Sequence, residues 1–121
     1  MIIIKNVYWL DKETNEAEVL VSDGKYDILC FAHPFKYHTK TIENILYAFE
    51  PKNIQLSVIE NFHIHNIQDT FKHQIIGKLL DKEKGIITVG DFIIEIDNNL
   101  IPKDINNEDY ISFECERIDI W

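Results

Sequence analysis

The sequence predicts an all-β protein in which one supersecondary unit occurs twice. The tetrapeptide Leu-Asp-Lys-Glu stands at residues 10–13 and again at residues 80–83. After each copy an apolar run reaches a glycine turn, at Gly24 and at Gly90, and an aromatic residue begins the next apolar run. Such self-similarity is typical of a duplicated unit. We therefore expect two small curved or barrel-like antiparallel units, analogous to OB or SH3-like barrels, packed as one globule.

These units divide the chain into a first β repeat at residues 1–56, a connecting strap at 57–71 and a second β repeat at 72–121. Each repeat alone buries too little surface for more than marginal stability. The whole chain of 121 residues, with 45% apolar residues, has the size and composition of one globular domain. We therefore expect the two repeats to fold as one cooperative domain.

Three strands are predicted at the start of the first repeat. Residues 2–10 are rich in β-branched and aromatic types on both faces, which is typical of a strand with little solvent exposure. Residues 17–22 and 26–32 flank the sequence Asp23-Gly24-Lys25, where glycine supplies the positive φ of a tight hairpin. Pro34 ends the third strand because proline has no N–H to donate to a ladder.

The segment before Pro51 permits two structures. Apolar residues at 42, 45, 46 and 49 have the spacing of an amphipathic helix, with Thr41 as its N-cap. The corresponding segment of the second repeat, residues 110–116, alternates like a strand. The repeat therefore favours a strand at 45–50, and a short helix at 41–50 is the alternative.

The second repeat predicts strands at 73–80, 86–89, 92–97 and 110–120. In the last strand the inward side chains begin as Ile111, Phe113 and Cys115 and then change parity to Ile118 and Ile120, which indicates a bulge or bend. Between the repeats, residues 57–71 contain neither proline nor glycine and predict an added strand or a strap. The expected core comprises Ile28, Leu46, Phe49, Ile76, Leu80, Ile94, Ile111 and Phe113.

Charge limits the partners to expect. The chain has 12 basic and 21 acidic residues, a formal net charge of −9. Nucleic acid and anionic membrane surfaces repel such a body, because proteins bind them through Lys and Arg. No stretch approaches the roughly 20 apolar residues of a membrane span, and the N-terminal run lacks the basic residues of a signal peptide. We expect a cytoplasmic protein that binds neither nucleic acid nor membrane.

Motifs for metal binding and catalysis are weak. His63 and His65 share one face of the strand expected in the strap, a spacing compatible with metal ligation. Exposed strand histidines are the simpler interpretation, so no metal and no cofactor are predicted. The two cysteines are too few for a disulfide framework, and neither a nucleophile elbow nor a glycine-rich phosphate loop is present. No catalytic residue is predicted, and a metal-dependent enzyme is the minor alternative.

Acidic residues concentrate in the second repeat, where residues 71–121 carry six basic and eleven acidic side chains. The candidate binding residues there are Glu108, Asp109, Glu114 and Glu116. Long-range attraction between such a surface and a basic protein speeds their association. The sequence therefore predicts a non-catalytic protein-interaction module, an accessory or inhibitory protein of a basic partner. A small-ligand or oligosaccharide-binding β-barrel is the alternative, which a concave aromatic cleft would favour over a flat acidic face.

Overall fold

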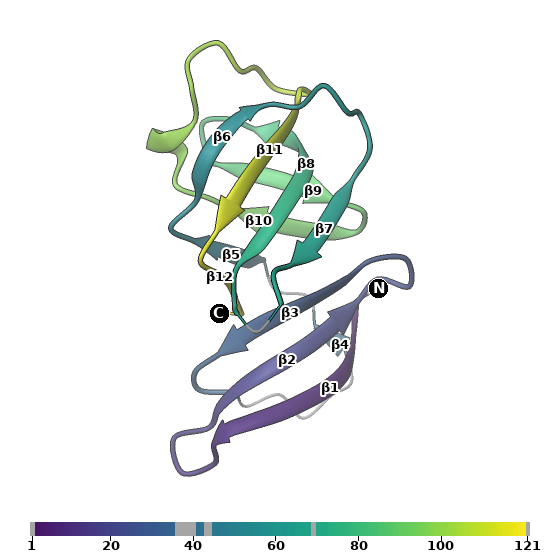
Figure 1. Cartoon of the computed structure of the whole chain (residues 1–121), viewed down its shortest axis with the longest axis vertical. Helices are drawn as coiled ribbons and strands as arrows, with labels where there is room; N and C mark the ends of the chain where they lie inside the picture. Colours follow the sequence, from purple (N-terminus) through teal and green to yellow (C-terminus); the bar gives the residue numbers. More distant parts are fainter. Residues whose placement is uncertain (1, 36–40, 43–44, 69, 121) are drawn as a thin grey trace.

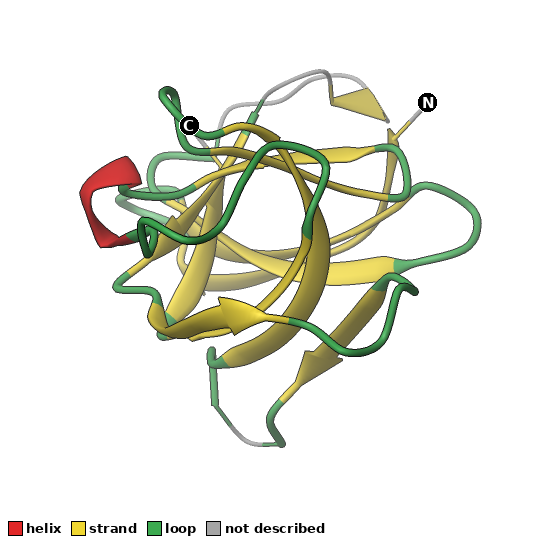
Figure 2. Ribbon diagram, turned by 90° about the horizontal axis from the view of Figure 1, so that it is seen from above, coloured by secondary structure: helices red, strands yellow, loops and turns green. Residues whose placement is uncertain are grey.

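The computed structural model describes residues 2–35, 41–42, 45–68 and 70–120, and this part of the chain is all-β, as predicted (Figures 1 and 2). The first six strands are β1 (Ile2–Asp11), β2 (Glu16–Ser22), β3 (Asp27–Ala32), β4 (Thr41–Ile42), β5 (Leu46–Phe49) and β6 (Lys52–Leu56). The other six are β7 (His63–Asn66), β8 (His73–Asp81), β9 (Ile86–Val89), β10 (Phe92–Glu95), β11 (Tyr110–Cys115) and β12 (Arg117–Ile120). A 3-10 helix, η1 (Asn98–Leu100), follows β10. None of the helices in the described ranges is long and apolar enough to cross a membrane.

One sheet contains all the strands. Neighbours follow the order β4-β1-β2-β3-β12-β5-β10-β9-β8-β11-β6, and β7 lies beside β8. Figure 1 shows β1 to β4 at one end of the molecule and β8 to β11 at the other, with β5 and β12 between them. The path does not close among the described strands, so of the predicted curved or barrel-like forms the closed barrel is absent and the sheet is open. The division into two duplicated units stays a prediction.

Apart from β6 at one end, the strand order is nevertheless the same on both sides of the β12–β5 pair. Outward from β12 come β3, β2, β1 and β4, and outward from β5 come β10, β9, β8 and β11. Both halves have a register shift at the corresponding place, around Leu10 in β1 and around Leu80 in β8. Each copy of the Leu-Asp-Lys-Glu motif therefore leaves its strand through the same bulge and turn.

Two strand pairs are parallel, which the predicted antiparallel units did not include. β12 pairs with β3, and β10 pairs with β5, in both cases across the two halves of the chain. Parallel pairing requires a long connection between the strands. Here most of the chain lies between β3 and β12, so the two halves share their central strands instead of closing separately.

The predicted bend in the last strand is confirmed. β11 ends at Cys115, and β12 begins at Arg117. The buried side chains shift from positions 111, 113 and 115 to positions 118 and 120, as expected. The bend sends β12 out of the second half to its place between β3 and β5. The strand predicted at 45–50 is also confirmed by β5, and the described residues of the alternative helix lie in or beside β4 and β5.

The predicted core is largely confirmed, with two exceptions. Leu80 is 48% exposed because it is the extra residue of the bulge between Leu79 and Asp81. Phe49 is 36% exposed because Leu46 and Ala48 take the inward positions of β5. The buried members of the predicted core are Ile28, Leu46, Ile76, Ile94, Ile111 and Phe113.

A continuous row of buried side chains crosses the centre of the sheet. Its members are paired in register from strand to strand, and each is at most 7% exposed. The row consists of Ala17, Ala32, Ile120, Leu46, Ile94, Ile87 and Leu79. Successive residues of a strand point to opposite faces, so the residues adjacent to this row point away from the core.

Candidate binding surface

An outward row of aromatic and acidic side chains lies next to the buried row. Register pairs connect its members across six strands, β1, β2, β3, β12, β5 and β10. In that order they are Tyr8, Glu18, Phe31, Asp119, Tyr47 and Glu95. Aromatic rings and carboxylates alternate along it without interruption. We call this set the aromatic–acidic row.

A groove opens over the middle of the aromatic–acidic row. Its volume is about 530 Å³, and β3, β5 and β12 supply most of its lining. The lining residues are Phe31, His33, Tyr47, Phe49, Arg117, Asp119 and Ile120. We call it the central groove.

Arg117 organises the central groove. Its Nε donates a hydrogen bond to Oδ1 of Asp119 at 2.7 Å. Its Cζ lies 4.6 Å from the ring centroids of both Phe31 and Phe49. Each such contact contributes about 0.5–1 kcal/mol at an exposed site and more when desolvated. The guanidinium therefore holds two aromatic walls of the groove and one carboxylate in a fixed arrangement.

The connecting segment extends the aromatic wall. Phe71 meets Phe31 edge to face at a centroid distance of 6.0 Å, and His33 approaches the same ring at 6.5 Å. Edge-to-face pairs of this kind add about 0.5–1.5 kcal/mol beyond their burial. The aromatic surface is thus assembled from residues far apart in the sequence.

A second hollow lies further along the aromatic–acidic row, over β1, β2 and β3. Its volume is about 410 Å³, and it is lined by Tyr8, Glu18, Leu20, Asp27, Leu29 and Asn66. Asp27 forms an ion pair with Nζ of Lys5 at 3.1 Å. Hydrogen bonds from the Ser22 hydroxyl and from Lys5 lower the pKa of Asp27. We call this cavity the β1–β3 hollow.

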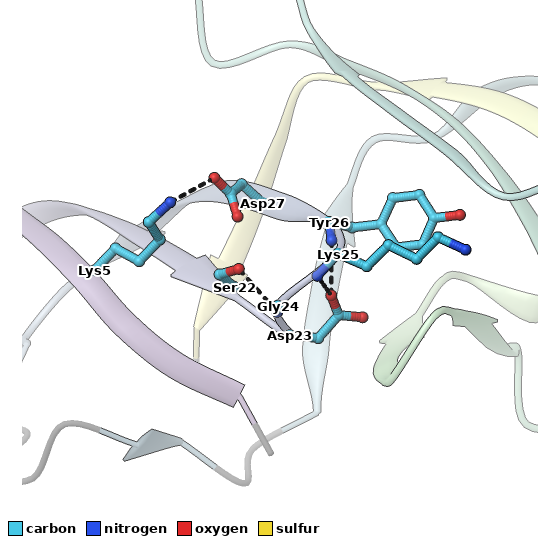
Figure 3. Close-up of polar contacts among 7 residues, drawn as sticks. All are labelled: Lys5, Ser22, Asp23, Gly24, Lys25, Tyr26 and Asp27. Carbon is cyan, nitrogen blue, oxygen red and sulfur yellow. Dashed lines mark hydrogen bonds and ion pairs between the residues drawn. The ribbon is translucent and has the colours of Figure 1, made fainter.

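A third hollow, of about 630 Å³, adjoins the β2–β3 turn. Polar contacts among the residues of this turn hold it together, as Figure 3 shows. Oδ1 of Asp23 accepts hydrogen bonds from the N–H groups of Lys25 and Tyr26, and its Oδ2 accepts one from the N–H of Asp91 at 2.9 Å. Gly90 has a positive φ of 57°, and any side chain there would collide with the Asp23 carboxylate. This arrangement ties the turns of the two halves together, and we assign it a structural role.

The predicted histidine pair lies on β7, away from the central groove. His63 and His65 are exposed, and their rings stack at 6.3 Å. The described residues contain no group of three or more His, Cys, Asp or Glu side chains able to hold a metal ion. His73 is fully buried in β8, where its Nδ1–H donates to the carbonyl oxygen of Phe71. Burial lowers the pKa of His73 to about 4.

The four predicted acidic residues do not form one patch. Glu108 and Asp109 precede β11, whereas Glu114 and Glu116 lie at its far end, roughly 17 Å away along the strand. Glu108 pairs with Lys78, and Glu116 pairs with Lys52, each at 2.9 Å. Neither terminal strand is an edge of the sheet, because β11 lies between β6 and β8, and β12 lies between β3 and β5.

Both cysteines are buried as free thiols. Burial raises the pKa of Cys115 to about 12 and raises that of Cys30 further. Neither thiol has the exposure or the lowered pKa of a reactive cysteine.

Sequence reasoning missed the central groove. Phe49 was assigned to the core, and Arg117 was given no role. One signal was present: Arg117 is the single arginine of a chain with eleven lysines. A planar guanidinium stacks on aromatic faces, whereas an ammonium group does not, so the choice of arginine marks a stacked position.

No protein-family model matches the chain, and neither a curated protein nor a solved structure matches it. A proposal for its function therefore rests on the geometry and chemistry of the surface.

Proposed function

We propose that the protein is a non-catalytic interaction module that binds a basic protein partner through the outward face of β3, β5 and β12. One observation carries the proposal: the central groove brings Phe31, Tyr47 and Phe49 together with the single arginine. Aromatic residues and arginine are enriched at the centres of protein interfaces and among the residues that dominate binding energy.

Electrostatics favours a basic partner. The chain has a net charge of −9, and Glu18, Asp119 and Glu95 place carboxylates along the row that the groove occupies. Long-range electrostatic attraction between these carboxylates and a positively charged protein accelerates their encounter. The residues Glu108, Asp109, Glu114 and Glu116 add to this field from outside the groove, as rim charges.

The length of the row also favours a macromolecular partner. Six strands spaced about 4.8 Å apart span roughly 24 Å from Tyr8 to Glu95. A small ligand would cover only part of that distance. A segment of a protein partner would reach from the β1–β3 hollow across the central groove.

A small ligand or an oligosaccharide is the second candidate, and the shape of the central groove favours it. The groove is concave and aromatic, and its volume of about 530 Å³ is within the range of small-molecule sites. Arg117 and Asp119 would supply directional hydrogen bonds there. This candidate gives no role to the net charge or to the carboxylates outside the groove, so we place it second.

Paired affinity capture tests the proposal. Phe49→Ala removes one exposed wall of the central groove, and Leu100→Ala is the matched control because Leu100 is an exposed apolar residue on η1. We expect wild-type protein and the Leu100→Ala variant to retain the same basic protein from a lysate of the source cell. Phe49→Ala should reduce its affinity at least tenfold, which corresponds to about 1.4 kcal/mol. Equal retention by Phe49→Ala, or capture of no basic protein, would reject the proposal.

A further inference from the structure

We infer that the partner docks through an extended proline-rich segment in the polyproline II conformation, which crosses the strands along the aromatic–acidic row. Two basic residues of the segment, six positions apart, would meet Glu18 and Glu95. This inference rests on the proposed function and specifies the form of the partner at that site.

Strand pairing limits how a segment can bind. The six strands of the aromatic–acidic row include β2, β3, β12, β5 and β10, each of which has a strand on both sides. At the row itself, the residues from Glu18 to Glu95 are paired in register with the strands on both sides, so their backbone N–H and C=O groups are not offered to a partner. A partner segment therefore cannot add as another strand along the row, and side chains must provide the recognition there. Polyproline II segments bind in this way, on aromatic grooves, because their backbone makes no internal hydrogen bonds.

The spacing of the rings matches the polyproline II repeat. Successive rings of the row are two strands apart, about 9.6 Å, from Tyr8 to Phe31 and from Phe31 to Tyr47. A polyproline II helix has three residues per turn and rises about 9.3 Å per turn, so prolines at every third position meet successive rings. Side chains on one face of an extended β-strand repeat at about 6.8 Å, and two turns of an α-helix rise about 10.8 Å. The polyproline II repeat gives the closest match.

The carboxylates set the positions of the basic residues. Asp119 already holds Arg117, so Glu18 and Glu95 are the carboxylates of the row that remain for a partner's cations. They are four strands apart, about 19 Å. Six residues of polyproline II span about 18.6 Å. Over these four strand spacings the twist of the sheet turns Glu95 by roughly 80–100° relative to Glu18, a difference that the long lysine or arginine stems would span.

Arg117 shows that this surface binds a guanidinium. It lies against Phe31 and Phe49 and donates to Asp119, which is the combination of ring and carboxylate found along the row. The β1–β3 hollow repeats that combination with Tyr8 and Glu18, and the lining residues described there include no cationic side chain. A basic residue of the partner would occupy this hollow as Arg117 occupies the central groove.

Synthetic peptides of one composition test the inference. The spaced peptide is Ac-PRPPPPPRP-NH2, and the control Ac-PPPRRPPPP-NH2 carries the same charge with adjacent arginines. We expect the spaced peptide to bind at least tenfold more tightly in calorimetry or NMR titration. A glycine version, Ac-GRGGGGGRG-NH2, should bind more weakly than the spaced peptide because it must lose conformational entropy to become extended.

Variants of the protein complete the test. Glu18→Gln and Glu95→Gln should each remove most of the preference for the spaced peptide, and Glu83→Gln, at an exposed turn outside the row, should leave it unchanged. Equal affinity for the two proline-rich peptides, or binding of neither, would overturn the inference. The proposed function is judged separately by whether Phe49→Ala loses the captured partner, so the two failures are distinguishable.

Discussion

The two faces of the central strands differ in chemistry although their residues alternate along the same short segments. The inward positions of β3, β12, β5 and β10 carry Ala32, Ile120, Leu46 and Ile94, all nearly fully buried. The outward positions next to them carry Phe31, Asp119, Tyr47 and Glu95. At these positions aliphatic side chains thus face the core, and aromatic and charged side chains face away from it. The difference indicates that the inward face maintains the fold, while the outward face is available for binding.

Truncation on each face should produce the largest contrast in stability. Leu46→Ala removes a fully buried side chain and should lower the free energy of unfolding by about 2–5 kcal/mol, through lost burial and the cavity that remains. Phe49→Ala, three residues further along β5, should cost less than about 1.5 kcal/mol, because its ring is partly exposed. Urea denaturation of both variants measures the difference. Equal losses would show that the outward face is also required for the fold.

Acid should lower the free energy of unfolding through the buried side chain of His73. The pKa of this buried histidine falls from 6.5 to about 4 in the folded protein, chiefly because of burial. The unfolded chain therefore binds a proton first, so the contribution of neutral His73 is complete above pH 6.5 and is lost as the pH falls towards 4. A shift of this size corresponds to about 3 kcal/mol.

The His73→Leu variant isolates that contribution. Its unfolding free energy should fall by about 3 kcal/mol less than that of the wild-type protein between pH 7 and pH 4. His63→Leu, at an exposed position of β7, is the control and should follow the wild-type curve. Parallel pH profiles for wild type and His73→Leu would contradict the assignment.

The contact between the two turns should have a smaller effect. Burial by itself raises the pKa of Asp23, but the N–H groups of Asp91, Tyr26 and Lys25 outweigh it and lower the pKa overall. Asp23→Asn should cost about 1 kcal/mol at pH 7, because the amide cannot accept all of these hydrogen bonds. The difference from wild type should begin to shrink as the pH falls below about 3.8, the pKa of an unperturbed Asp carboxyl, and should disappear once the pH falls below the lowered pKa of Asp23 in the folded protein. Asp104→Asn, on an exposed loop, is the control in thermal unfolding.

Charge reversal outside the central groove should change stability least. Glu116→Lys removes a surface ion pair with Lys52, and exposed pairs of this kind contribute little to stability. Combined reversal at Glu114 and Glu116 should slow association with a basic partner more than it speeds dissociation, and the effect should shrink at high salt. Stopped-flow association rates at low and high salt measure it. Salt-independent association would limit the net charge to a role in solubility.

The strands could be predicted from the sequence, but the strand pairing that makes the outward side chains neighbours could not. Alternation in 73–80 and 110–120 and the glycine turns at Gly24 and Gly90 mark local structure directly. The aromatic–acidic row depends on the register of parallel pairs that join Phe31 to Asp119 and Tyr47 to Glu95. Alternation within one strand contains no information about which distant strand lies beside it. The bulge at Leu80 and the outward position of Phe49 likewise depend on pairing partners.

Mapping of the partner's footprint by NMR tests the central claim most directly. With the captured partner added to labelled protein, the largest backbone chemical-shift changes should lie at Phe31, Tyr47, Phe49, Arg117 and Asp119, which line the central groove. The buried row, from Ala17 to Leu79, should show smaller changes. Changes confined to residues 108–116, with the central groove unaffected, would contradict the account.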